Sequence, residues 1–162
     1  MSKIDVLAEE FLAQKNIAVA GVSIKSNNTA NIIYKRLKET GHTVFPVNPN
    51  SDIFDGGKCY PDVKSVPLKI DGVVIVTKAS NTEKIIKDCV DAGIHRVWMH
   101  NVLGNKGSDK KGSSISGKAV QMCRDNNISV IPGGCPMMFC KPVDFWHKCM
   151  RGFARLVGGF RF

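Results

Sequence analysis

Apolar and polar positions follow two patterns along the chain. Five short segments are almost continuously apolar and are bounded by glycine, proline or polar residues, which is typical of strands buried on both faces. They span 17–23, 43–49, 71–77, 96–99 and 128–134. Four other segments repeat apolar residues every three or four positions, and this spacing predicts amphipathic helices. They span 4–14, 29–40, 81–93 and about 115–126.

The order of these elements predicts the fold class. Strands and helices alternate through most of the chain, and continuously apolar strands form parallel sheets that helices cover on both faces. The connections between such strands are right-handed. We therefore expect an α/β fold with a doubly wound, five-stranded parallel sheet, built by residues 1–140 as one domain.

The last segment, 141–162, is expected to add a helix to this domain. Over 141–157 the spacing places several apolar side chains on one helical face, and the simplest interpretation is that this face docks on the domain. A dimer contact and a membrane-surface helix remain alternatives. The residues on this face are Trp146, Cys149, Met150, Phe153 and Val157.

Charge and length narrow the classes of partner. The 162 residues carry 23 lysines and arginines against 14 acids, a net charge of +9 that favours anionic partners. No nucleic-acid motif is recognisable, and we expect no nucleic-acid partner. No apolar run reaches the roughly 18 residues that a membrane span requires. The N-terminus lacks a secretory signal, so we expect a cytoplasmic protein.

The six cysteines fit a reducing compartment because they form no CxxC pair. Cys89 and Cys123 fall on apolar helix faces, where we expect core positions. A cluster of Cys135, Cys140 and His147 with the nearby Cys149 matches no zinc spacing, and we expect no metal site.

Chemistry is expected at the carboxyl ends of the strands, where open α/β sheets bind ligands. All five strands end in polar or turn-forming loops. The loop after the first strand does not match a dinucleotide fingerprint, because Gly21 stands alone where the pattern GxGxxG has three glycines. At the end of the second strand, Asn48 and Pro49 stand where a dinucleotide site has an acid that binds the ribose. A phosphate remains compatible with Ser23, Lys25 and the start of the next helix.

Taken together, these loops resemble the small CoA-binding protein family, which is similar to the CoA-binding domain of the succinyl-CoA synthetase α subunit. The stretches that carry the resemblance are IAVAGVS at 17–23, GHTVFPVNPN at 41–50, DGVVIVT at 71–77, AGIHRVWM at 92–99 and NNISVIPGGCP at 126–136. The resemblance implies a Rossmann-like fold that binds coenzyme A (CoA) or acyl-CoA along its strand ends.

The resemblance also implies a set of ligand-binding residues. Nucleotide phosphates would lie at Gly21, Ser23 and Lys25, and the adenosine at Asn48 and Pro49. Thr77, Lys78 and Ala79 would follow the pantetheine arm, Trp98 and Met99 match the fourth-strand motif, and Gly134 and Cys135 would lie near the thiol. The chain departs from the family at His100, where a glutamine is usual, at the PGG stretch, and from Met137 onward.

Two functions remain open at this point. The first is a CoA or acyl-CoA binding protein without catalytic machinery of its own. The second is a CoA-dependent acyl-transfer enzyme or ligase partner subunit that uses Cys135 as nucleophile, its thiolate favoured by loop amides and lysines. The synthetase's phosphohistidine belongs to another domain, so the resemblance implies binding but not catalysis. The expected partners are CoA and either a second copy or a partner enzyme subunit.

Overall fold

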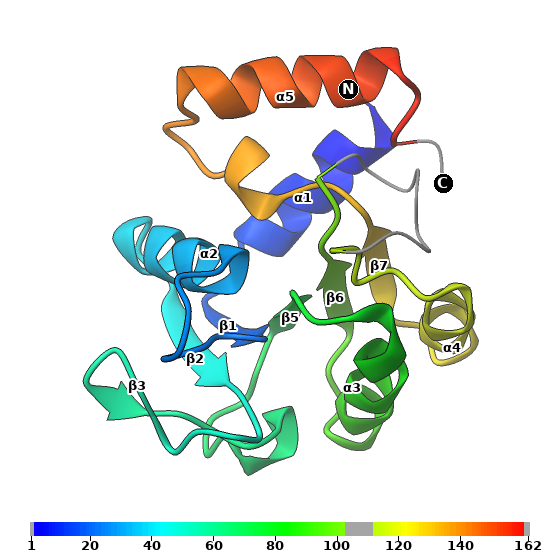
Figure 1. Ribbon diagram of the computed structural model, residues 1–162. Helices are drawn as coiled ribbons and strands as arrows, with labels where there is room; N and C mark the ends of the chain where they lie inside the picture. Colours follow the sequence, from blue (N-terminus) through cyan, green and yellow to red (C-terminus); the bar gives the residue numbers. More distant parts are fainter. Residues whose placement is uncertain (1, 103–111, 161–162) are drawn as a thin grey trace.

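The computed structural model describes residues 2–102 and 112–160. Its centre is a parallel sheet of five strands in the order β2-β1-β5-β6-β7 (Figure 1). This confirms the predicted five-stranded, doubly wound α/β fold. The strands are β1 Asn16–Ala20, β2 Thr43–Val47, β5 Gly72–Ile75, β6 Arg96–Met99 and β7 Ser129–Pro132.

Helices cover both faces of the sheet and divide the core in two. Helices α1 and α2 pack on one face, and α3 and α4 pack on the other. The alternation of side chains along β6 shows this division, because Trp98 points into the first core while Val97 and Met99 point into the second. The helices are α1 Lys3–Leu12, α2 Thr29–Glu39, α3 Ala79–Asp91 and α4 Gly117–Asp125.

The order of the strands creates a switch point between β1 and β5. From β1 the chain crosses through α2 to β2 on one side, whereas from β5 it winds through α3 and α4 toward β7 on the other side. The connections at β1 and β5 therefore leave toward opposite faces of the sheet and open a crevice at the carboxyl ends of the strands.

A small hairpin and a 3-10 helix lie between β2 and β5, where the sequence predicted only a loop. Strands β3 Ile53–Phe54 and β4 Gly57–Lys58 are joined by Asp55 and Gly56, both with positive φ. Asp-Gly is a favoured pair for such a tight turn. The segment continues through the 3-10 helix η1 Val63–Ser65.

The C-terminal segment forms the 3-10 helix η2 Pro136–Met138 and the helix α5 Phe145–Leu156, which lies at one end of the molecule beyond α1 (Figure 1). The sequence predicted a helix from 141, but Asp144 caps α5 by accepting a hydrogen bond from the His147 backbone N–H at 2.9 Å. The helix therefore begins four residues later than predicted.

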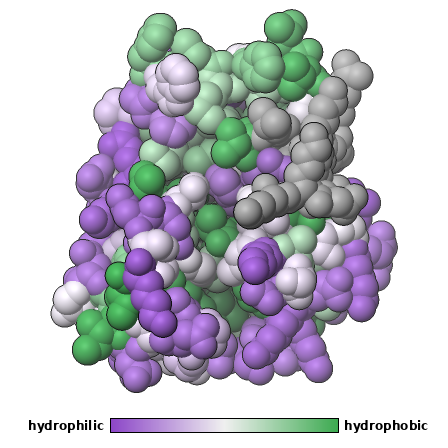
Figure 2. Space-filling model, viewed as in Figure 1, coloured by the Kyte–Doolittle hydropathy of each residue, from purple (hydrophilic) through white to green (hydrophobic). Residues whose placement is uncertain are grey.

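The prediction that the apolar face of this helix docks on the domain is wrong for most of that face, because only Met150 and Val157 are partly buried and Met150 packs against the first core. Trp146 is 70% exposed and Phe153 is 56% exposed, and apolar residues gather on the surface over α5 (Figure 2). The helix also buries Ala154 and makes polar contacts, in which Arg155 pairs with Asp5 and Arg151 donates to the Met138 carbonyl. These arginines lie on the side of the helix opposite Trp146 and Phe153.

Candidate functional site

A cleft of about 620 Å³ lies at the switch point. The ends of β1, β2 and β5 form its floor, and η1 and the first turns of α3 form its walls. Five of the residues that the sequence assigned to the ligand line this cleft: Gly21, Asn48, Pro49, Thr77 and Lys78.

The close approach of the ends of β1 and β5 requires a glycine at position 21, on the floor of the cleft. Its φ is +112°, and a Cβ atom there would stand 2.3 Å from the Val76 carbonyl oxygen. Its backbone N–H donates to the Val47 carbonyl at 3.0 Å, which joins the end of β1 to the end of β2. The lone glycine therefore lets three strand ends converge without a glycine-rich phosphate loop.

Asn48 fixes the loop after β2 against the loop after β1. Its side-chain amide donates to the Val22 carbonyl at 2.6 Å, and its carbonyl oxygen accepts from the Asn50 backbone N–H at 2.8 Å. Pro49 follows in an exposed position at the rim of the cleft. The Asn-Pro pair therefore shapes the wall of the cleft where a dinucleotide site would carry an acid.

The loop between β1 and α2 is held by Asn31, which the sequence analysis missed. Its side-chain oxygen accepts from the Ser23 backbone N–H at 2.9 Å, and its amide donates to the carbonyls of Ser23 and Ser26 at 2.7 and 3.0 Å. Asn31 is only 8% exposed.

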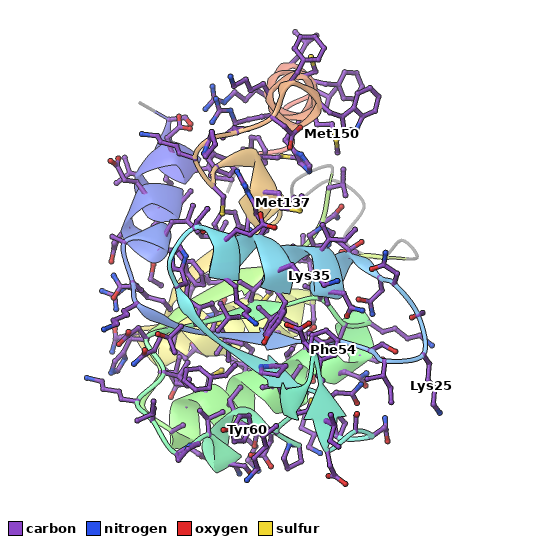
Figure 3. The ribbon with its side chains drawn as sticks, turned by 90° about the vertical axis from the view of Figure 1, so that its left-hand side faces the viewer. Lys25, Lys35, Phe54, Tyr60, Met137 and Met150 are labelled. Atoms are coloured by element: carbon purple, nitrogen blue, oxygen red, sulfur yellow. The ribbon has the colours of Figure 1, made fainter. Side chains whose placement is uncertain are left out.

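Ser23 and Lys25 lie in this loop rather than in the lining of the cleft. The Ser23 hydroxyl accepts from the Lys25 backbone N–H at 3.1 Å, which leaves its proton free to donate to a ligand. Figure 3 shows the Lys25 side chain extending from the loop into solvent. Both residues are placed to meet an anion only where it extends beyond the cleft toward α2.

The first turn of α3 opens toward the cleft at Lys78. Lys78 is the N-cap residue, and its side chain forms no capping hydrogen bond. Thr77 is fixed through its carbonyl, which accepts from the Ser114 hydroxyl at 2.7 Å. Ala79 is the first helical residue. This small residue leaves the approach to the helix N-terminus open.

The charged side chains that line the cleft balance in number, with Lys78 and Lys84 against Asp62 and Asp88, but they differ in their partners. Asp88 pairs with Lys64 at 3.0 Å, and Asp62 accepts from the backbone N–H of Ser65 at 2.8 Å. Lys78 and Lys84 line the cleft and form no ion pair within residues 2–102 and 112–160. Lys78 and Lys84 therefore offer positive charge that no carboxylate of the described residues pairs with, and an anionic group could bind there.

Trp98 and Met99 lie in the core beneath this edge of the sheet. Neither has any exposed side-chain area, so neither contacts a ligand in this conformation. The Trp98 indole N–H donates to the Gly133 carbonyl at 2.9 Å, and its ring meets Phe11 edge-on at 5.5 Å. Trp98 thus supports the corner after β7 from below.

The corner around Cys135 is packed by the protein's own side chains. A Cβ on Gly134 would stand 3.1 Å from the Phe160 ring and 3.5 Å from Ile4. This corrects the expectation that the glycines make room for a ligand. Cys135 is 3% exposed, and burial raises the pKa of its thiol to about 12. The expected reactive thiolate is therefore not formed here near neutral pH.

One buried polar side chain at this edge has no hydrogen-bond partner. His100 follows β6, is 4% exposed, and neither of its ring nitrogens bonds to any group of the described residues. Burial lowers the pKa of this imidazole from 6.5 to about 4, so it is uncharged near neutral pH. Buried side chains without a hydrogen-bond partner are uncommon in folded proteins, and His100 therefore calls for an explanation.

Comparison with known proteins identifies the family. Residues 15–141 match the family model for a CoA binding domain, which is most of the chain. The chain belongs to the CoA-binding domain family. The matched region contains every site residue named above, and it ends before α5 begins.

The relatives of this CoA-binding domain fall into two groups. The chain is 25% identical over 127 residues to an ADP-forming acetate–CoA ligase from Archaeoglobus fulgidus. The aligned region covers 78% of this chain and 18% of the ligase. It is 24% identical to the uncharacterized protein YneT from Bacillus subtilis, covering 80% of this chain and 87% of YneT. The chain thus spans under a fifth of the ligase and most of YneT.

Solved structures support the same fold. A hypothetical protein from Pyrococcus horikoshii superposes with a TM-score of 0.75 at 28% identity, covering 86% of this chain and 91% of that protein. A dinucleotide-forming acetyl-coenzyme A synthetase from Ca. Korarchaeum cryptofilum, solved with phosphate and ADP, superposes with a TM-score of 0.61 at 27% identity. It shares 78% of this chain and 27% of its own length.

The described residues contain no group of three or more histidine, cysteine, aspartate or glutamate side chains that would hold a metal ion. None of the helices in the described part of the chain is long and apolar enough to cross a membrane. The cysteines are all free thiols, and Cys89 and Cys123 are fully buried in the core as expected.

Proposed function

We propose that this domain binds CoA or acyl-CoA and carries no thiol catalyst of its own. The observation that carries the proposal is the cleft at the switch point, which lies within the matched family region and is lined by two lysines that form no ion pair among the described residues. CoA is a long polyanion, and it needs one positively charged crevice followed by a row of strand ends. Two unpaired lysines at the cleft and the open turn of α3 meet this need.

The cleft suggests how the parts of CoA divide along the edge. We assign the adenosine to the wall formed by Asn48 and Pro49, and the phosphates to Gly21, Ser23 and Lys25 beside the N-terminus of α2. The pantetheine arm then follows Thr77, Lys78 and Ala79 toward β6. The assignment of the arm to Thr77 and Lys78 is supported by their place in the lining of the cleft.

An acyl-transfer enzyme that uses Cys135 is less consistent with the geometry. A nucleophilic cysteine needs a low pKa and access to its substrate. Burial gives Cys135 a high pKa, and Met138 and Cys140 lie with it in the same buried cluster. We therefore infer that the domain presents CoA to a separate enzyme, and that it does so in the cytoplasm, where free thiols persist.

Isothermal titration calorimetry tests this proposal. We expect micromolar binding of CoA and acetyl-CoA, weaker binding as salt increases, and no binding of NADH, because no acid stands at the ribose position. Lys78→Gln with Lys84→Gln should weaken CoA binding about tenfold, whereas Lys15→Gln, at an exposed position before β1, should not. Absence of CoA binding to the unaltered protein would refute the proposal.

A further inference from the structure

His100 stands apart from the other buried polar side chains near the carboxyl edge of the sheet. Thr82 donates to the Ser114 carbonyl at 2.7 Å, and Ser114 donates to the Thr77 carbonyl at 2.7 Å. Trp98 donates to Gly133. Only the two imidazole nitrogens of His100 are buried without a partner among the described residues. The orphaned imidazole is therefore a local exception in a well-satisfied network.

The backbone holds His100 firmly in place. Its N–H donates to the Ile75 carbonyl at 2.9 Å, and its carbonyl accepts from the Ser114 N–H at 3.0 Å. The first of these bonds extends the hydrogen bonding between β5 and β6 by one residue, and the second ties His100 to the segment before α4. Strand alternation then places the imidazole on the same face as Trp98. The side chain is thus fixed at a defined position, and its unmet hydrogen bonds do not result from a loose loop.

His100 lies between the cleft and the Cys135 corner. In the sheet, β6 is flanked by β5, whose end carries Thr77 at the cleft, and by β7, whose end carries Gly134. A ligand that leaves the cleft along the sheet edge toward β7 therefore passes the end of β6. Both imidazole nitrogens are enclosed in this conformation, so contact with such a ligand requires a local rearrangement around β6.

The protonation state of the imidazole determines which chemical group of the ligand it can hydrogen-bond. An uncharged imidazole has one N–H donor and one acceptor nitrogen. A phosphate needs donors and positive charge, and burial removes that charge from His100 near neutral pH. A secondary amide carries one donor and one acceptor, which match the imidazole in number and type. The amides of a pantetheine arm have this character.

We propose that His100 is a ligand-contacting residue whose imidazole hydrogen-bonds the amide-containing pantetheine arm of CoA as the arm crosses the end of β6. This inference rests on the proposed function and makes it more specific. The arm supplies the partners that the two nitrogens lack within the chain. His100 thereby discriminates ligands that carry the arm from nucleotides that do not.

Calorimetric titration of His100 variants tests this proposal with two ligands. His100→Leu should raise the Kd for CoA about tenfold, because the arm loses its partners, and should leave binding of adenosine 3′,5′-bisphosphate, which lacks the arm, unchanged. His100→Gln restores a donor and an acceptor and should recover most of the affinity. His95→Leu, at an exposed position before β6, is the matched control and should bind both ligands normally.

Thermal unfolding of the same variants separates contact from structure. Removing an unsatisfied buried polar group should leave the Tm of His100→Leu unchanged or raise it. Equal loss of both ligands, or a lowered Tm, would assign His100 a structural role and overturn the inference. Unaltered CoA affinity would do the same. If the unaltered protein binds neither ligand, the proposed function fails, and this result is distinct from a failure at His100 alone.

Discussion

The two tryptophans show how a residue's surroundings determine its role. Trp98 has no exposed side-chain area, meets Phe11 and Phe139 and donates to Gly133. Trp146 is 70% exposed on α5. Both belong to apolar patterns in the sequence, and the pattern alone does not separate them. Their difference arises because β6 is an interior strand of the sheet, covered on the Trp98 face, while α5 lies at the surface.

Alanine substitutions should separate the two tryptophans. Trp98→Ala removes a large buried ring and a hydrogen bond, and we expect a loss of roughly 3–5 kcal/mol in the free energy of unfolding. Trp146→Ala should change it by less than about 0.5 kcal/mol. Urea unfolding followed by circular dichroism measures both. Similar losses for the two variants would show that α5 buries its aromatic face.

Thiol labelling at pH 8 should distinguish Cys149 from Cys135. Cys149 is the exposed cysteine, whereas Cys135 is buried with its pKa raised to about 12. We expect iodoacetamide to modify Cys149 first and Cys135 only on unfolding, since the thiolate is the reactive form. Peptide mass spectrometry reads the order. Early modification of Cys135, with Cys149→Ser as the control, would support the nucleophile hypothesis instead.

At the scale of elements, the sequence predicted the strands and helices that have a periodic apolar pattern. It missed the features that depend on individual contacts. The five parallel strands were predicted from continuous apolar runs, because such short runs are typical of strands that are buried on both faces of a parallel sheet. The hairpin at 53–58 was missed because its strands are two residues long and lack a periodic pattern. The orientation of α5 was mispredicted because it involves contacts of Arg155 with Asp5 and of Arg151 with the Met138 carbonyl. No pattern in the sequence reveals these contacts.

The candidate site was predictable to a similar extent. The strand ends were located correctly, and five of their residues line the cleft. Asn31 was missed because its hydrogen bonds span the loop after β1, a contact visible only in three dimensions. Cys135 was placed near a ligand because Gly-Gly-Cys-Pro reads as an open turn, whereas Phe160 and Ile4 fill the space beside Gly134.

The loop between β1 and α2 should depend on Asn31. Asn31→Ala leaves the Ser23 N–H and two carbonyls without partners, and we expect a loss of roughly 1–3 kcal/mol in the free energy of unfolding together with weaker CoA binding. Asn27→Ala, at an exposed position in the same loop, is the control. Denaturant unfolding and calorimetry measure the two effects. Unchanged stability in Asn31→Ala would contradict this account of the loop.

For the whole molecule, burial of His100 links stability to pH. Its pKa is about 4 in the folded protein and 6.5 when unperturbed. As pH falls below about 6.5, His100 binds a proton in the unfolded chain but not in the folded chain. The free energy of unfolding therefore falls until about pH 4, where the folded chain also binds the proton. The total loss from this group is roughly 3 kcal/mol.

His100→Leu should remove this part of the pH dependence. Thermal unfolding of both proteins between pH 7 and pH 4 gives the comparison, with His95→Leu as the exposed control. The unaltered protein and the control should lose stability more steeply than His100→Leu. Parallel curves for all three proteins would show that His100 becomes protonated in the folded state.

The measurement that tests the central claim most directly is backbone amide shift mapping of the ¹⁵N-labelled protein during titration with CoA. The account predicts saturable shifts that are largest at Gly21, Asn48, Thr77 and Lys78 and small along α5. Absence of shifts would contradict the proposed function. Shifts concentrated on α5, or around Asp5, Glu9 and Arg151, which line a second cavity of about 550 Å³, would place the ligand elsewhere and contradict the assignment of the cleft.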